Sequence, residues 1–254
     1  MKKLNNIIGF TLLLSFVNIS NAEKAPFESS YEPLPSTNTI FRNANIYDGD
    51  GNEFNETDLL IKDGKIIAIG KDLPGSSDFI EVDATNKWIT PGIIDIHSHM
   101  GVYSAPSVSS SSDGNEATSP VTADVWAEHS IWTQDPQFAL ALKGGVTTFH
   151  VLPGSANLIG GRGVTAKNVQ RNTINSMKFP NAPHTLKMAC GENPKRVYGN
   201  RKQAPSTRMG NIAGYRKAWI DAESYLSRLD EYDSKSDEAK EIGYKPKRDL
   251  ELET

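Results

Sequence analysis

The segment that most constrains the fold is Trp88–His99, a short apolar stretch that ends in two histidines separated by one residue. Its central part, Ile93–His97, is mostly β-branched and follows Pro91-Gly92. Such a run is typical of a strand buried on both faces of a parallel sheet. Because side chains alternate along a strand, Asp95 and both histidines are expected to share one face.

The spacing of His97 and His99 suits a metal ion. Two residues of strand rise separate their Cα atoms by about 6–7 Å, and from there one nitrogen of each ring can reach a single divalent cation at about 2.0–2.1 Å. Histidines at the end of an apolar strand also lie at the rim where α/β barrels place their chemistry. The pattern therefore predicts a metal site, whereas isolated histidines are usually surface or core residues.

The run Pro-Gly-Ile-Ile-Asp-Ile-His-Ser-His resembles the first-strand metal motif of the amidohydrolase superfamily, whose members are metal-dependent hydrolases built on a (β/α)₈ barrel. The closest likeness is to the imidazolonepropionase-like and prolidase-like branch. Asp58–Gly70, Gly144–Thr148 and Lys187–Arg196 resemble the same family, and the likeness extends from about Asn38 to the end of the chain. It implies a hydrolase that acts on carbon–nitrogen bonds in amides, cyclic amides or dipeptides through a metal-activated water. The implied cofactor is one or two divalent ions, zinc by default.

Residues 1–22 read as a signal peptide. Lys2-Lys3 gives a positive start, Ile7–Val17 is apolar, and Ser20-Asn21-Ala22 supplies small residues before the cleavage site. The apolar run is shorter than the about 20 residues of a membrane-spanning helix, which favours cleavage over an uncleaved anchor. We expect a periplasmic or secreted mature chain that starts at Glu23 and has no membrane contact after cleavage.

The rest of the chain divides into three parts. Residues 23–38, rich in Pro, Ser and Glu, are an extended lead-in that packs weakly. Residues 39–90 are all-β, with a hairpin at Asp63-Gly64; the resemblance makes them the N-terminal part of a small β-sandwich. The Asp-rich segment Asp48–Glu53 lacks the spacing of a calcium loop and reads as a turn.

Residues 91–254 have an α/β pattern, and the resemblance makes them an incomplete (β/α)₈ TIM-type barrel of about three βα units. We expect barrel strands at Ile93–His97, Val146–Val151 and Thr185–Gly191, and helices within Pro120–Lys143 and Ser206–Leu229. Val102–Thr118 and Gly160–Gly163 read as loops, the first either enclosing a substrate or simply solvated.

Four residues besides the motif are site candidates. The resemblance implies a further metal ligand that is either a Glu or a carboxylated Lys, and Glu192 is preferred over Lys187 because it follows the end of its strand. The alternative is that neither residue binds metal. His150 either supports a metal ligand or contacts the substrate, or else it is a packed histidine. Arg162 is a candidate for a substrate carboxylate or, less favourably, for phosphate. Asp95 is expected to orient an imidazole. Cys190, the single cysteine, reads as a small core residue and excludes an internal disulfide.

The length bears on activity. Residues 91–254, the expected barrel part, number 164 of the 254 residues, whereas a usual (β/α)₈ barrel takes about 250. The resemblance implies that the proton-shuttle Asp comes from the eighth strand and is expected beyond residue 254, so no catalytic residue is assigned here. The alternative to an active hydrolase is an inactive fragment, or a half-barrel that depends on a partner.

The expected partners follow from charge and from the strand edge. A net charge of −4 without a basic, aromatic-rich stretch argues against nucleic acid, and a small amide or peptide-like substrate is expected instead. An unpaired strand edge favours a homo-oligomer or pairing with a missing C-terminal half. An intact binding module without hydrolysis is the least favoured reading.

Overall fold

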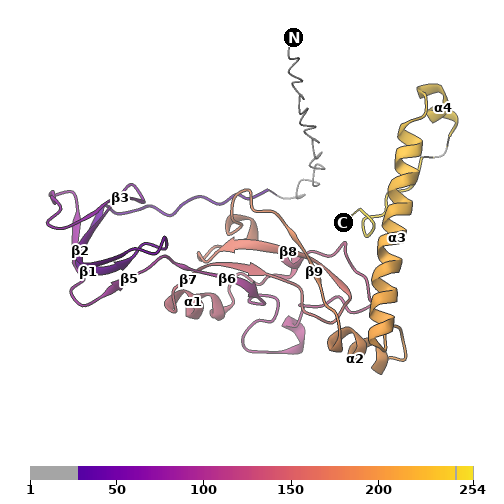
Figure 1. Ribbon diagram of the computed structural model, residues 1–254, viewed down its shortest axis with the longest axis horizontal. Helices are drawn as coiled ribbons and strands as arrows, with labels where there is room; N and C mark the ends of the chain where they lie inside the picture. Colours follow the sequence, from indigo (N-terminus) through magenta and orange to yellow (C-terminus); the bar gives the residue numbers. More distant parts are fainter. Residues whose placement is uncertain (1–27, 244, 254) are drawn as a thin grey trace, which may run out of the picture.

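The computed structural model describes residues 28–243 and 245–253. The expected signal peptide and the start of the lead-in lie outside this part of the chain. The described residues form two β-sheets connected through residues 90–92, followed by a long helix that stands beside the second sheet (Figure 1). Within these residues, no helix has the length and apolar character needed to cross a membrane.

The first sheet has five strands with β1 near its centre. They are β1 (Thr39–Tyr47), β2 (Glu53–Lys62), β3 (Lys65–Gly70), β4 (Ile80–Asp83) and β5 (Trp88–Ile89). β1 pairs antiparallel with β2 and parallel with both β4 and β5, and β2 pairs antiparallel with β3. The predicted hairpin is confirmed: Asp63 and Gly64 both have positive φ, as a two-residue hairpin turn requires.

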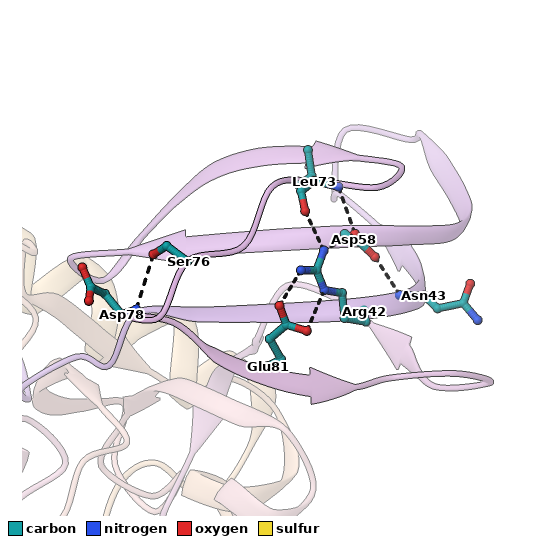
Figure 2. A network of polar contacts seen from close by, with 7 residues as sticks. All are labelled: Arg42, Asn43, Asp58, Leu73, Ser76, Asp78 and Glu81. Atoms are coloured by element: carbon teal, nitrogen blue, oxygen red, sulfur yellow. Dashed lines mark hydrogen bonds and ion pairs between the residues drawn. The ribbon is translucent and has the colours of Figure 1, made fainter.

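A small apolar cluster stabilises this sheet. Its buried members come from β1, β2 and the β4–β5 turn: Ala44, Ile46, Leu59 and Ala84. Beside it, the Arg42 guanidinium forms hydrogen bonds with two carboxylates and one backbone carbonyl, as Figure 2 shows. It donates to Asp58 at 2.8 Å, to Glu81 at 2.6 Å and to the carbonyl of Leu73 at 2.7 Å. This arginine therefore connects β1, β2, β4 and the segment after β3.

The second sheet has four strands in the order β6–β7–β8–β9. They are β6 (Ile93–Ser98), β7 (Val146–Val151), β8 (Ile159–Lys167) and β9 (Thr185–Met188). β6 and β7 are parallel, as predicted. Gly92 allows their close approach, because a Cβ there would lie 2.1 Å from the Thr147 hydroxyl.

The prediction that Gly160–Gly163 is a loop was wrong. These residues lie in β8, which pairs antiparallel with both β7 and β9. Glycine is depleted in strands, but here the glycines let other segments of the same polypeptide approach β8 closely. A Cβ on Gly161 would lie 2.3 Å from the carbonyl oxygen of Val125. The mixed α/β class is confirmed, while the sheet contains an antiparallel strand that a simple βα repeat does not include.

Four α-helices and three short 3₁₀ helices complete the fold. They are η1 (Ser109–Ser111), η2 (Ala127–Ser130), α1 (Pro136–Lys143), η3 (Ile174–Ser176), α2 (Glu192–Asn200), α3 (Arg208–Asp233) and α4 (Asp237–Ile242). The expected long helix over Pro120–Lys143 is confined to α1, because Asp135 caps its N-terminus and Pro136 opens it. Upstream, Val121 and Trp126 make bridges to β8 instead.

The main core lies between β7, β8 and the segments that cover their outer face. Its buried members are Val102, Ala127, Phe138, Phe149, Val151, Val164, Ala166 and Met177. The helix expected within Ser206–Leu229 is confirmed, but several of its periodic apolar residues, Ile212, Trp219 and Leu226, are exposed, and its buried residues are Asn211 and Tyr225. The periodicity located the helix correctly but not the face that packs.

β6 is less buried than predicted. Its isoleucines at positions 93, 94 and 96 are 54%, 63% and 77% exposed. The reason is topological, since β6 is at the edge of its sheet and pairs with β7 alone among the described strands.

Two segments expected to be loosely held make specific contacts. Asp135 accepts the backbone N–H of Gly101 at 2.9 Å and that of Ala105 at 3.3 Å, which fixes the start of the loop after β6. In the lead-in, the N–H of Ser30 donates to the carbonyl of Asn175 at 2.9 Å. The loop after β6 is therefore tied to the N-terminus of α1, and the lead-in is tied to η3.

Candidate metal centre

His97 and His99 lie at the C-terminal end of β6 and are close together. Their ring centroids are 5.2 Å apart and the ring planes are nearly perpendicular, at 85°. The local cause is the short strand, which ends at Ser98 and turns at Gly101, where φ is +81°. The predicted juxtaposition of the two imidazoles is present.

Lys187 on β9 approaches His97 across the sheet. Its Nζ lies 3.3 Å from Nε2 of His97, and the lysine is only 8% exposed. Burial lowers the pKa of Lys187. The pKa of His97 is also lowered, first by the charge of Lys187 and then by burial and by His99, with Asp95 opposing.

His99 presents a defined nitrogen. Its Nδ1 lies 2.9 Å from the carbonyl oxygen of Leu152. Because a carbonyl can only accept, Nδ1 carries the hydrogen and the lone pair is on Nε2. This is the arrangement in which metal-binding histidines are oriented by a second contact. Tyr103 packs edge-on against the same ring, with centroids 5.7 Å apart.

Asp95 and His150 are near these rings but do not bond to them. Asp95 accepts the backbone N–H of His97 at 3.1 Å, so its carboxylate fixes the main chain and not an imidazole tautomer. The His150 ring is held by the hydroxyls of Thr165 at 2.9 Å and Thr185 at 2.7 Å. Burial lowers the pKa of His150, and the charges of His184 and His97 lower it further.

Glu192, the preferred third ligand, is not brought to the histidines. It begins α2 on the surface and forms an ion pair with Arg196 at 2.8 Å. The described residues contain no group of three His, Cys, Asp or Glu side chains able to share a metal. The strand ends at Met188 rather than Gly191. Position 192 therefore lies beyond the sheet, and Lys187 occupies the place assigned to Glu192.

Arg162 and Cys190 have no part in this cluster. The guanidinium of Arg162 stacks over Trp126, 4.5 Å from the ring centroid. Along β8 it alternates with Gly163 and Thr165 and shares its face with the buried Val164 of the core. That face is opposite to the one where Thr165 meets His150. Cys190 is exposed, so its assignment to the core was wrong.

The donor set at the centre fits a divalent metal ion in part. Two imidazoles, one with its lone pair directed away from a carbonyl contact, match the ligands that zinc prefers. Lys187 supplies an amine in contact with His97, and an amine of this kind becomes an oxygen ligand when it is carboxylated. The sequence favoured Glu192 over this lysine because Glu192 follows the end of the expected strand, whereas in the structure it is Lys187 that reaches His97.

No family model matches the chain. Individual proteins do match it, and those described below are an amidohydrolase and a dihydroorotase. The amidohydrolase tasK of Hapsidospora irregularis is 34% identical over 224 residues, which are 84% of this chain and 22% of that protein. A dihydroorotase of Ligilactobacillus salivarius is 43% identical over 63 residues, 24% of this chain and 14% of that protein.

One solved structure matches over most of the chain. The amidohydrolase from Thermotoga maritima MSB8 is 38% identical, with a TM-score of 0.73 over 85% of this chain and 54% of that one. The chain thus spans about a fifth of the first relative and about half of the solved structure. Similarity in sequence and fold, together with the histidine pair at the end of β6, leads to one assignment: this chain belongs to the amidohydrolase superfamily.

Proposed function

We propose that the chain contributes the first part of the metal centre of a hydrolase that acts on carbon–nitrogen bonds. The observation that supports this most directly is the 3.3 Å contact between Lys187 and His97, beside His99. His97, His99 and a carboxylated Lys187 are the proposed ligands, in place of the set that included Glu192. When bound, a divalent ion, zinc by default, lowers the pKa of its water and polarises the scissile carbonyl.

The side chains have distinct roles in this proposal. His99 is held by Leu152 with Nε2 free to coordinate. Lys187 is carboxylated when its neutral amine attacks carbon dioxide: the nitrogen–carbon bond forms, one proton leaves, and the product is a carbamate with one negative charge. Asp95 holds the backbone at His97 and thereby the direction of that ring.

We propose that β6–β9 form part of a (β/α)₈ barrel whose inner face carries these ligands. In support, β6 and β7 are parallel, and His97 and His99 are at the carboxyl end of β6, where barrels gather catalytic groups. The substrate class we propose is a small amide, cyclic amide or peptide-like molecule, as the relatives' names include a dihydroorotase.

A second proposal concerns association. The three exposed isoleucines of β6 lie on a strand edge that lacks a partner among the described strands. Exposed apolar edges favour pairing with another strand. We propose that further polypeptide, in the same or another molecule, covers this edge and completes the centre. Export is also proposed, from the sequence of residues 1–22 alone, and N-terminal sequencing of the exported protein should then begin at Glu23.

The test of the metal centre uses the chain as expressed. Zinc content is measured with and without added bicarbonate, and ¹³C NMR follows the carbamate carbon from labelled bicarbonate. We expect zinc to be retained with bicarbonate and a carbamate signal that Lys187→Met abolishes. Zinc binding that persists in a His97→Ala, His99→Ala variant would contradict the proposal. Hydrolysis of amide substrates is a separate readout, because it also requires the groups that complete the site.

A further inference from the structure

A cavity of about 510 Å³ lies between α3 and the outer side of the β8–β9 region. Ile159 of β8, Leu186 of β9 and Leu158, which precedes β8, line one side, and α3 forms the facing wall. The C-terminal segment, which returns alongside α3 in Figure 1, adds Glu251 and Leu252. The size and the mainly apolar lining are in the range of sites for small organic molecules.

The room for this cavity comes from small side chains on α3. Five of the α3 positions that line it, at helical spacing, are glycine or alanine: Gly210, Ala213, Gly214, Ala218 and Ala222. Gly214 is in close contact with Leu158, since an added Cβ would lie 2.4 Å from Cδ1 of that leucine. Away from this contact the small residues leave space, and Trp219 is at the border of the cavity.

The cavity is separate from the candidate metal centre. Leu186 and Lys187 are neighbours on β9, so their side chains point to opposite faces. Lys187 is against His97, whereas Leu186 lines the cavity.

The polar end of the cavity is acidic. Asp221 and Glu251 line it. Among the described residues that line the cavity, Lys217 is the one basic side chain. The ammonium of Lys217 is already held by the carboxylate of Asp221, one turn along the helix. Burial raises the pKa of Glu251, and the charges of Asp124, Asp249 and Asp221 raise it further. The charge of Lys217 acts in the opposite direction and is outweighed. Negative charge at this end is therefore in excess.

We propose that this cavity binds a small organic cation with an apolar body, a phenylalkylamine in its simplest form. The apolar body would lie between the small residues of α3 and the leucines of the sheet, and the ammonium beside Glu251 and Asp221. Charge complementarity favours this occupant over an anion, because the one lining cation is already paired. The site is independent of the proposed hydrolase activity.

The test compares three probes that differ only in the polar end: 4-phenylbutylamine, 4-phenylbutanol and 4-phenylbutyrate. Binding to the full chain is measured by saturation-transfer NMR and by the fluorescence of the tryptophans, which include Trp219. We expect the amine to bind at least tenfold more tightly than the alcohol, and the acid to bind most weakly. Equal binding of all three, or no binding of the amine, would overturn the proposal.

Two pairs of variants locate the site. Ala218→Phe fills the cavity and is expected to abolish amine binding, whereas Ser224→Phe adds the same ring on an exposed position of α3 outside the lining and should not. Glu251→Gln is expected to reduce the preference for the amine over the alcohol at least threefold, whereas Glu223→Gln, also exposed on α3, should leave it unchanged. Circular dichroism checks the fold of each variant, and the Glu251 pair keeps the test decisive where Ala218→Phe fails to fold. Amine binding unaffected by Ala218→Phe in a folded protein would place the ligand elsewhere and refute the proposal.

Discussion

The Nζ atom of Lys187 lies 3.3 Å from Nε2 of His97, although the two residues are 90 positions apart in the chain. The contact joins β6 and β9, the first and last strands in the order of the second sheet. It replaces Glu192, which the order of residues along β9 had favoured. Burying a cation is costly, so a buried amine in contact with the His97 imidazole favours a functional role for Lys187.

Substitution of the proposed ligands is the most direct prediction. Losing a residue that merely orients a ligand typically weakens metal affinity about 10–100-fold, so His97→Ala and Lys187→Met should each weaken zinc binding at least that much. Competition with a fluorescent chelator measures the affinity. Glu192→Gln is the matched control, because Glu192 pairs with Arg196 on the surface; a comparable loss in that variant would restore Glu192 as a ligand.

Asp135 is predicted to be important for stability. Its buried carboxylate accepts from the N–H groups of Gly101, Ala105 and Gln137 and from the Gln137 side chain. Asp135→Ala removes a helix cap and leaves several donors unpaired, which should cost about 2–4 kcal/mol of unfolding free energy. Urea denaturation measures this cost. Asp113→Ala, at an exposed position of the loop after β6, should change this free energy by less than about 0.5 kcal/mol.

The Arg42 network of Figure 2 predicts that the free energy of unfolding decreases at acidic pH. The hydrogen bond from Arg42 lowers the pKa of Glu81. At Asp58 burial acts to raise the pKa, but hydrogen bonds from the N–H of Asn43, from Arg42 and from the N–H of Leu73 outweigh it, and the pKa is lowered.

Both carboxyls thus have a lower pKa in the folded chain than in the unfolded one, where the ordinary values are 3.8 and 4.5. Their contribution is present above those values and is lost as the pH falls through the folded-state pKa. We expect the urea midpoint to fall between pH 5 and pH 3, and to fall less in Arg42→Met, which is also less stable at pH 7. An identical pH profile in the variant would show that Arg42 does not lower these pKa values.

The exposed edge strand predicts self-association. Ile94 and Ile96 offer apolar surface on a strand that, within the described residues, pairs with β7 alone. A double change to lysine should increase the monomer fraction in sedimentation experiments, while the unfolding free energy changes by no more than about 0.5 kcal/mol per site. Ile66→Lys on β3, 62% exposed in the other sheet, is the control. If Ile66→Lys increased the monomer fraction as much as the double change on β6, the association would be general aggregation and not pairing at the β6 edge.

The sequence by itself determined the local features of the fold. The β-branched run with its Pro-Gly lead located β6, Asp63-Gly64 located the hairpin, and the period of residues 206–229 located α3. These assignments depend on interactions between residues close in sequence, such as turn geometry and side-chain alternation. For the same reason the pair His97 and His99, two residues apart, was predictable as a cluster.

Only the tertiary structure decided which distant groups meet and which faces are covered. It assigned Lys187 rather than Glu192 to the histidines, made β8 a strand despite its glycines, and left the apolar side chains of β6 and of Ile212 on α3 exposed. Each outcome depends on the register and order of strands in the sheet. Register and order arise from the summed packing of segments far apart in the chain, so no local pattern contains them.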